Sequence, residues 1–235
     1  MRNNSHSSKN TLLKLCIIEA ERVIQMPLRE IRIISPDASL GIWITDETLV
    51  SLESQFPAEV LSSSVHLSLP TEKRKMEWLT TRLLIKELLQ TDKFSLEHLS
   101  TGKPFLENDE RSISISHSEK YTTVLISKTG NTGIDIQTLK HDIVKGSYYF
   151  LSDKEVKQIG GTDKNLAMHV YWCAKEVLIK YFNASGIDFK SKIYIEPFSF
   201  QSKGEIIGKI NLNGEQHTMH ISYETCNEYV LAYAV

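Results

Sequence analysis

The chain has 235 residues, a formal net charge of −2 at pH 7, 41% hydrophobic residues and 24% charged residues. This balance is typical of an ordinary globular protein and excludes collagen-like, intrinsically disordered and disulfide-scaffold proteins. No apolar run approaches the roughly 20 residues that span a bilayer, so we expect no membrane partner. Three widely separated cysteines form neither a disulfide framework nor a zinc-binding pattern, which favours the cytoplasm.

The N-terminal part predicts an extension, two strands and a helix. In residues 1–25 the apolar residues after residue 11 follow a helical period, and we treat this segment as an added, helical extension. Strands are expected at residues 31–34 and 40–44, because β-branched residues flank a turn there. Residues 45–61 are expected to form a helix.

The clearest helix of the first half follows Pro70 and extends to Leu89, with apolar residues three and four positions apart. Its first turn carries Lys73, Arg74 and Lys75. The helix dipole disfavours cations at this end unless an anion binds there. The cluster is therefore a candidate anion-binding site.

Strands and helices alternate irregularly along the rest of the chain. Residues 112–116 alternate as a strand, with 121–127 as the hairpin partner and 132–137 as a further strand. Helices are expected at 152–159 and 165–182, and short antiparallel strands over 193–235.

This order predicts an α+β fold rather than a doubly wound parallel sheet. A strand–helix–strand layout recurs on either side of about residue 120. We therefore divide the chain into the extension at 1–25, an N-terminal lobe at 26–125 and a C-terminal lobe at 126–235.

Two acidic residues are candidates for a metal site. Asp135 is flanked by isoleucines in a strand, where a carboxylate needs a counter-charge or a metal, and Gln137 shares its face. On the last helix, Glu176 lies four residues before Lys180, a spacing that more often marks an ordinary ion pair. Together Asp135 and Glu176 could hold Mg²⁺, which needs only one or two carboxylates.

Two further motifs suit a phosphate ligand. Ser116-His117-Ser118 ends a strand without the glycines of a hydrolase nucleophile elbow, and Gly102-Lys103-Pro104 holds a lysine on a rigid turn. A solvated histidine and an ordinary turn remain the alternative interpretations. The common nucleotide-binding motifs are absent from the sequence.

Together these motifs resemble the 4′-phosphopantetheinyl transferase superfamily, in particular its long, monomeric, surfactin-synthetase-activating type. The resemblance covers about residues 70–200, and its segments occur in the order of the family: Gly102-Lys103-Pro104, Ser116-His117-Ser118, Gly133-Ile134-Asp135-Ile136-Gln137, and Trp172-Cys173-Ala174-Lys175-Glu176 with Lys180. The W-x-x-K-E-x-x-x-K pattern is the most specific of them.

The resemblance implies two pseudo-symmetric lobes, each a small antiparallel sheet packed with a long helix, and an active site in the cleft between them. The implied enzyme is a monomer that moves phosphopantetheine from coenzyme A to a serine of an acyl or peptidyl carrier protein. Adenosine 3′,5′-bisphosphate is released and Mg²⁺ is required. The implied metal ligands are Asp135, Gln137 and Glu176.

The resemblance also implies roles for the remaining motif residues. Glu176 would accept the serine proton, directly or through water, and Lys180 would contact the pyrophosphate. Coenzyme A would further contact the following residues: Lys73, Arg74, Lys103, Ser116 and His117. Glu155 resembles the acid of a family F-S-x-x-E element that Leu151 interrupts here, and it joins the catalytic set.

One departure opens an alternative. The family usually has glutamate where this chain has Gln137, which brings an oxygen but no charge. A member that binds coenzyme A or a carrier protein without transfer is therefore the second hypothesis. A nucleic-acid-binding module is the third, and the negative net charge and the lack of RNP, KH or helix-turn-helix motifs disfavour it.

Overall fold

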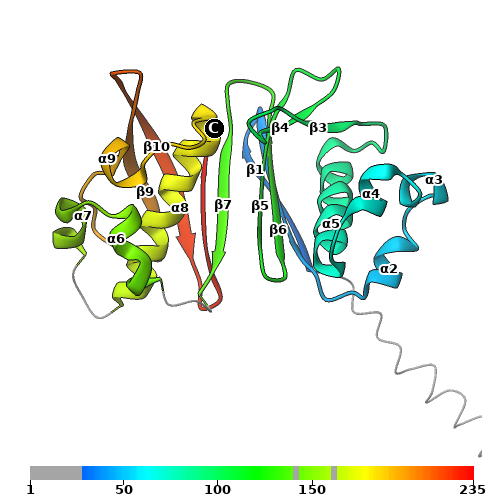
Figure 1. The fold of residues 1–235 in the computed structure, drawn as a ribbon, viewed down its shortest axis with the longest axis horizontal. Helices are drawn as coiled ribbons and strands as arrows, with labels where there is room; N and C mark the ends of the chain where they lie inside the picture. The colour runs from blue at the N-terminus through cyan, green and yellow to red at the C-terminus, as the bar shows by residue number, and fades with distance from the viewer. Residues whose placement is uncertain (1–27, 140–142, 160–162) are drawn as a thin grey trace, which may run out of the picture.

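The computed structural model describes residues 28–139, 143–159 and 163–235 (Figure 1). The fold combines α-helices with small antiparallel sheets, as the α+β prediction requires. The predicted helical extension at residues 1–25 lies outside the described residues. None of the described helices is long and apolar enough to traverse a bilayer.

The first sheet has four antiparallel strands in the order β1-β2-β6-β5. Helix α5 packs against it through Leu79, Leu84 and Ile85, which share a core with Trp43 and Ile113. The strands are β1 (Leu28–Ser35), β2 (Ala38–Ile44), β5 (Ser112–Ser118) and β6 (Tyr121–Ser127), and the helix is α5 (Glu72–Leu89).

Helix α5 begins and ends where its sequence directs. The Thr71 hydroxyl caps its first turn by accepting a hydrogen bond from the Arg74 N–H at 3.2 Å. The helix ends at Gln90, which adopts the left-handed conformation at φ 55°. The prediction of a helix from Pro70 to Leu89 is confirmed.

The helix predicted at residues 45–61 is wrong as a single element. Within this range the chain forms two short helices, α2 (Leu49–Glu53) and α3 (Ala58–Leu61), and a third, α4 (Ser64–Ser68), follows it. Pro57 is the N-cap of α3, and a proline disfavours helical geometry at the residue before it. The apolar period therefore continues across a break that the proline imposes.

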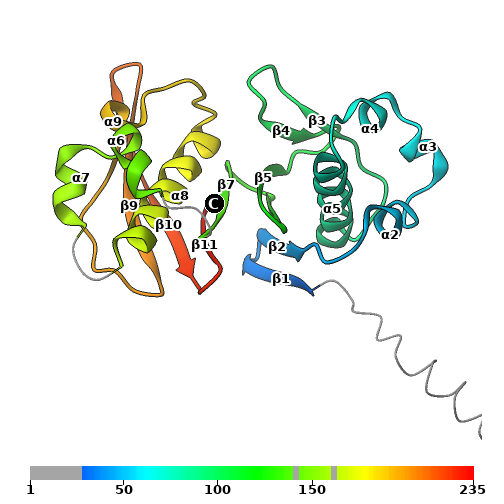
Figure 2. The ribbon, with the colours of Figure 1, turned by 60° about the horizontal axis from the view of Figure 1, so that its bottom comes forward.

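The second sheet has five antiparallel strands in the order β7-β11-β10-β9-β8, and helix α8 packs on it (Figure 2). Strands β9 and β10 are longer than the short segments predicted there. The strands are β7 (Gly133–Thr138), β8 (Ile193–Ile195), β9 (Lys203–Leu212), β10 (Glu215–Thr225) and β11 (Tyr229–Ala234), and the helix is α8 (Lys164–Phe182).

Strand β7 approaches α8 closely because its first residue is Gly133. A Cβ atom at this position would collide with the backbone carbonyl of Val177 in the middle of α8. The missing side chain brings Asp135, two residues further on, beside the C-terminal half of the helix. Helix α8 then ends at Asn183, in the left-handed conformation at φ 52°.

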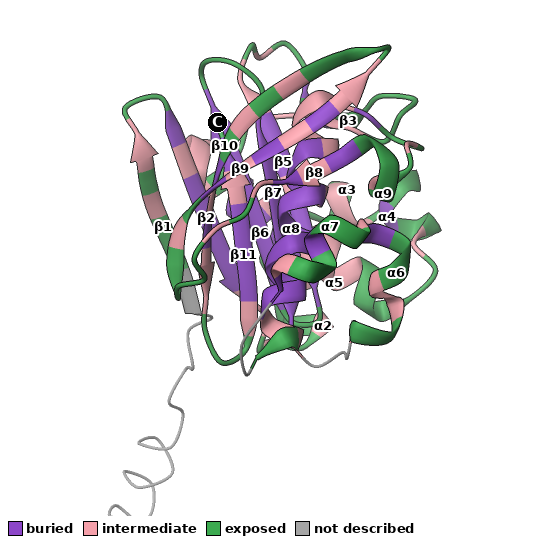
Figure 3. Cartoon of the chain, turned by 90° about the vertical axis from the view of Figure 1, so that its left-hand side faces the viewer, coloured by how far each residue is buried: buried purple, intermediate pink, exposed green. Residues whose placement is uncertain are grey.

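The two sheets meet along strands β5 and β7, which are joined by serine side chains. The hydroxyls of Ser114, Ser116 and Ser118 accept hydrogen bonds from the backbone N–H groups of β7 residues Ile134, Ile136 and Thr138, at 3.0, 3.3 and 2.9 Å. Alternate strand residues share a face, so the S-x-S-x-S spacing aligns all three hydroxyls with β7. A core cluster of residues from both sheets fills the interface. The strands that carry this cluster are largely purple, the colour of buried residues, in Figure 3.

Smaller elements complete the fold. The change of sheet falls at residues 128–132, a few residues after the predicted division between 125 and 126. The prediction of a helix at 152–159 is confirmed by α7, whose N-cap is Ser152. The elements are β3 (Leu96–His98), β4 (Pro104–Leu106), η1 (Val144–Gly146), α6 (Ser147–Phe150), α7 (Asp153–Gln158) and α9 (Phe189–Lys192).

Candidate functional site

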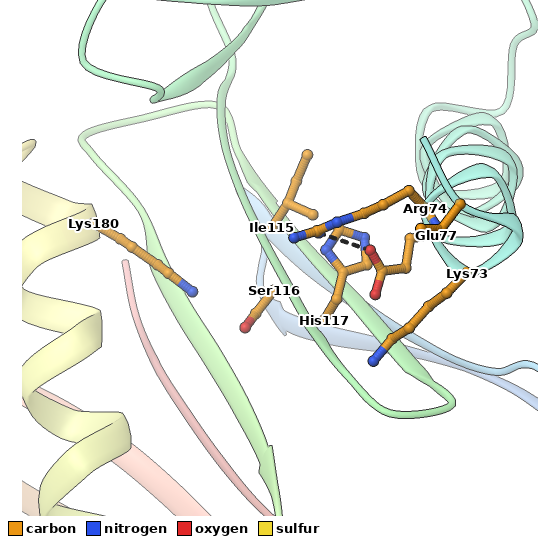
Figure 4. A pocket seen from close by; sticks show the side chains of 8 residues that line it. Lys73, Arg74, Glu77, Ile115, Ser116, His117 and Lys180 are labelled. Atoms are coloured by element: carbon orange, nitrogen blue, oxygen red, sulfur yellow. Dashed lines mark hydrogen bonds and ion pairs between the residues drawn. The ribbon is translucent and has the colours of Figure 1, made fainter. Parts of the chain in front are cut away.

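A pocket of about 380 Å³ opens between α5, β5 and α8 (Figure 4). Five of the predicted ligand-binding residues contribute to its walls, although they come from three elements far apart in the sequence. The lining residues are Thr71, Lys73, Arg74, Glu77, Ile115, Ser116, His117 and Lys180. The pocket is therefore rich in cations and hydrogen-bonding groups.

One wall is the first turn of α5. Arg74 donates a hydrogen bond from Nη1 to the Glu77 carboxylate at 2.8 Å, and its side chain is 64% exposed. Lys73 is also exposed. Two cations at a helix N-terminus are unfavourable without an anion, so this wall favours a negatively charged ligand.

His117 forms the floor between the two helices. The pKa of His117 is lowered to about 4, mainly by burial; Glu77 opposes the shift, and the positive charges of Lys180 and Arg74 add to it. The ring is therefore neutral at pH 7 in the ligand-free protein. An anion in the pocket would offset the two cations and favour protonation of the ring.

Asp135 is held firmly by one oxygen. Its Oδ1 accepts hydrogen bonds from Lys180 Nζ at 2.8 Å and from the Ser116 hydroxyl at 2.7 Å. Lys180 also donates to the Ile134 carbonyl at 2.8 Å, which fixes the ammonium group in place. The second oxygen, Oδ2, is buried and has no hydrogen-bond partner among the residues that the structure describes.

Glu176 lies close to this carboxylate. The pKa of Glu176 is raised to about 7, mainly by burial and then by the negative charge of Asp135, while Lys180 opposes the rise. Two carboxylates that repel each other and share one lysine are typical of a cation-binding site. The buried, unpartnered Oδ2 of Asp135 points to the same chemistry.

The residues present fit a magnesium ion. Across residues 28–139, 143–159 and 163–235, no group of three or more His, Cys, Asp and Glu side chains is arranged to hold a metal. Magnesium, however, is commonly bound through one or two carboxylates, with water and phosphate oxygens as further ligands. Gln137 follows Asp135 by two residues in β7, so its amide oxygen lies on the same face of the strand.

Lys103 lies in an adjoining pocket of about 170 Å³ that shares Ile115 and Lys180 with the first. Its loop is tied to the end of α8, because the Thr101 hydroxyl donates to Asn183 Oδ1 at 2.8 Å. Burial lowers the pKa of Lys103. Lys103 therefore adds a further cation to those of the first pocket, within reach of an elongated ligand that occupies both pockets.

Glu155 is separated from this group. Its Oε2 accepts from Lys175 Nζ at 2.8 Å, and Oε1 accepts from the Ile195 N–H at 2.9 Å. Oε2 also accepts from the Ser152 backbone as part of a capping box. The side chain of Glu155 is fully buried and both of its oxygens are engaged. Glu155 therefore has the contacts of a structural residue, whereas the motif resemblance placed it in the catalytic set.

Sequence reasoning missed two residues around His117. Glu77 and Thr81 follow Arg74 at helical spacings, so the three side chains share the face of α5 that meets His117. The spacing alone could have placed Glu77 beside the basic cluster. Lys75, which was predicted as part of that cluster, is absent from the pocket wall.

A scan against models of known protein families finds no match for this chain, and a search of curated proteins finds none either. Function is therefore inferred from the geometry of the site and from the motif resemblance.

Proposed function

We propose that the protein is a Mg²⁺-dependent 4′-phosphopantetheinyl transferase that acts on a serine of an acyl or peptidyl carrier protein. The main support is the meeting of Asp135, Glu176 and Lys180 beside a pocket lined with cations. A diphosphate needs this combination, because its negative charge must be neutralised from both a metal and basic side chains.

In this proposal the two sheets are pseudo-symmetric lobes. Each carries one long helix, α5 on the first and α8 on the second, and the pocket draws residues from both helices. Coenzyme A would lie in the cleft between the lobes. Lys103 would meet the adenine nucleotide, and Lys73, Arg74, Ser116 and His117 its 3′-phosphate.

The reaction is a substitution at the β-phosphorus of coenzyme A. The serine oxygen of the carrier forms a bond to that phosphorus, and adenosine 3′,5′-bisphosphate leaves with the electrons of the broken P–O bond. Lys180 stabilises the charge on the diphosphate, and Glu176 accepts the serine proton, directly or through a water molecule. Magnesium held by Asp135, Glu176 and Gln137 would supply further charge neutralisation.

Two features of the chain assist these steps. The Ser116 hydroxyl and Lys180 both bind Oδ1 of Asp135, so Oδ2 is the oxygen that would be left for a cation. The raised pKa of Glu176, at about 7, suits a group that must accept a proton near neutral pH. No nucleophile is needed in this chain, because the attacking serine belongs to the carrier.

The test is a transfer assay with the full-length protein, coenzyme A, Mg²⁺ and a panel of apo carrier proteins. A carrier whose mass increases by one phosphopantetheine group supports the proposal. Asp135→Asn should abolish this increase, whereas Glu205→Gln, an exposed substitution far from the pocket residues in the sequence, should not change it.

Gln137 supports a second candidate, a protein that binds coenzyme A or a carrier without transfer. An uncharged ligand weakens the metal site relative to the glutamate that the family usually has. Binding of coenzyme A without a mass increase on any carrier would establish this candidate in place of the first.

A further inference from the structure

The contact between Thr81 and His117 determines which ring nitrogen is available to a ligand. Thr81 Oγ1 lies 2.8 Å from His117 Nε2 and 2.7 Å from the Glu77 carbonyl oxygen. A carbonyl oxygen can only accept, and the threonine hydroxyl has one proton to donate. When that proton is directed to Glu77, Oγ1 can only accept from Nε2, which must then carry a hydrogen.

The other ring nitrogen then faces the ligand. A neutral imidazole carries one hydrogen, so an Nε2–H ring has a lone pair on Nδ1. Because Nε2 contacts Thr81 of α5 while the ring lines the pocket, Nδ1 is the nitrogen left for a bound group.

We propose that Thr81 is a positioning residue for His117: its hydroxyl accepts the Nε2 hydrogen, so that Nδ1 takes up a proton and binds a phosphate monoester in the pocket. This inference rests on the proposed function only for the identity of the phosphate-bearing ligand. The proton comes from solvent, and no covalent bond is made or broken.

The charges around the ring support proton uptake at this atom. Lys180 on α8 and Arg74 on α5 face His117, and Glu77 on α5 is the acidic neighbour. A phosphate monoester carries nearly two negative charges at pH 7. It would therefore outweigh the two cations and raise the pKa of His117 from its low value of about 4 in the free protein.

Thr80 provides a matched control on the same helix. Its hydroxyl is also buried and also bonds a backbone carbonyl one turn earlier, but its side-chain partner is the Thr122 hydroxyl at 3.0 Å. Thr80→Val and Thr81→Val therefore delete equivalent groups, and only the second removes the hydroxyl that contacts His117, whose ring also interacts with the Glu77 backbone. Thr81→Ser keeps that hydroxyl.

The first measurement is the ¹⁵N NMR spectrum of the histidine side chains in the free, full-length protein at pH 7, with the His117 signals assigned by their absence in His117→Gln. We expect the Nε2–H tautomer in the wild type, in Thr81→Ser and in Thr80→Val, and its loss in Thr81→Val. An Nδ1–H ring in the wild type, or an unchanged spectrum in Thr81→Val, would overturn the inference.

The second measurement is calorimetric titration with adenosine 3′,5′-bisphosphate at pH 7, in buffers of different ionisation enthalpy. We expect uptake of about one proton per ligand, with both His117 nitrogens protonated in the complex. Thr81→Val should bind about threefold to tenfold more weakly, as one lost hydrogen bond predicts, and Thr80→Val should bind as the wild type does.

The two proposals fail separately. Transfer to a carrier without proton uptake, or with an Nδ1–H ring in the free protein, refutes the role of Thr81 and leaves the enzyme assignment intact. An Nε2–H ring set by Thr81 in a protein that neither binds this ligand nor performs transfer refutes the phosphate role of Nδ1 together with the proposed function.

Discussion

Helix α8 anchors two lysine–carboxylate pairs that differ in how completely they are enclosed. Lys175 and Glu155 are both fully buried, and Lys175 Nζ also donates to the carbonyls of Phe150 and Ile193 at 2.7 and 3.0 Å. Lys180 and Asp135 are 25% and 8% exposed, and one oxygen of Asp135 has no partner among the described residues.

The difference separates a structural role from a chemical one. The first pair has every polar atom satisfied, so it fastens α7 and β8 to α8 and has no capacity left for a ligand. The second pair has an unsatisfied oxygen, a second carboxylate nearby and a pocket beside it. Of the two ion pairs, only the one with an unsatisfied polar atom therefore suggests a binding role.

The largest expected effect is on stability, at the enclosed pair. Lys175→Met leaves the Glu155 charge buried without its counter-charge and should lower the free energy of unfolding by about 3–5 kcal/mol. Lys180→Met, at the partly exposed pair, should lower it less, by about 1–3 kcal/mol, because Asp135 keeps the Ser116 hydrogen bond. Urea denaturation measures both, and equal losses would contradict the comparison.

The next effect is on transfer, at the open pair. Asp135→Asn keeps the shape of the side chain but removes its charge, and it should reduce the rate of carrier modification by at least about a hundredfold. Its unfolding curve should remain close to that of the wild type. Wild-type turnover in this variant would remove Asp135 from the site.

A smaller effect of opposite sign is expected at Glu176. Because the pKa of Glu176 is raised in the folded protein, to about 7, folding favours its protonated form. Without Mg²⁺, the free energy of unfolding should therefore fall as the pH rises from about 4.5 to about 7.

Replacing this carboxylate should relieve that penalty. Glu176→Gln should stabilise the metal-free protein at pH 8 by about 1–2 kcal/mol, whereas Glu155→Gln should destabilise it. Thermal unfolding at pH 5 and pH 8 tests both variants, and a loss of stability in Glu176→Gln at pH 8 would show that burial and Asp135 do not penalise the Glu176 charge.

The smallest effect concerns Gln137. Gln137→Glu adds a charge beside Asp135 and should tighten Mg²⁺ binding by about threefold to tenfold. Transfer activity followed as a function of Mg²⁺ concentration measures this change, with Gln137→Ala as the control for loss of the oxygen ligand. If Gln137→Glu instead needs a higher Mg²⁺ concentration for half-maximal activity, the amide donates a hydrogen bond that a carboxylate cannot replace.

The sequence predicted the elements whose patterns are locally complete. Helix α5 has a threonine cap and an unbroken apolar period, and β5 alternates apolar and polar residues and is followed by β6 across a tight turn. Residues 45–61 have a helical period too, but Pro57 divides them. The lesson is that periodicity predicts burial, whereas a proline decides continuity.

The site could be predicted only in part. Lys73, His117 and Lys180 line one pocket as the motif resemblance suggested, yet Glu155 belongs to a different ion pair. The sequence does not distinguish a carboxylate whose oxygens are all hydrogen-bonded from one with a free oxygen, so the role of each depends on its neighbours in the fold. Thr81 had no signal of its own, because a buried helical threonine is informative only once a histidine lies against it.

The serine rungs between β5 and β7 have a consequence for how this protein can vary. The hydroxyl of Ser116 accepts from the Ile136 N–H and donates to the Asp135 carboxylate, so a single oxygen both joins the two halves of the molecule and aims an acid. Assembly and chemistry are thereby coupled through one atom. Any change at that position must alter both. Substitution of Ser114 or Ser118, the neighbouring serines, would affect the junction of the sheets without removing a contact to Asp135.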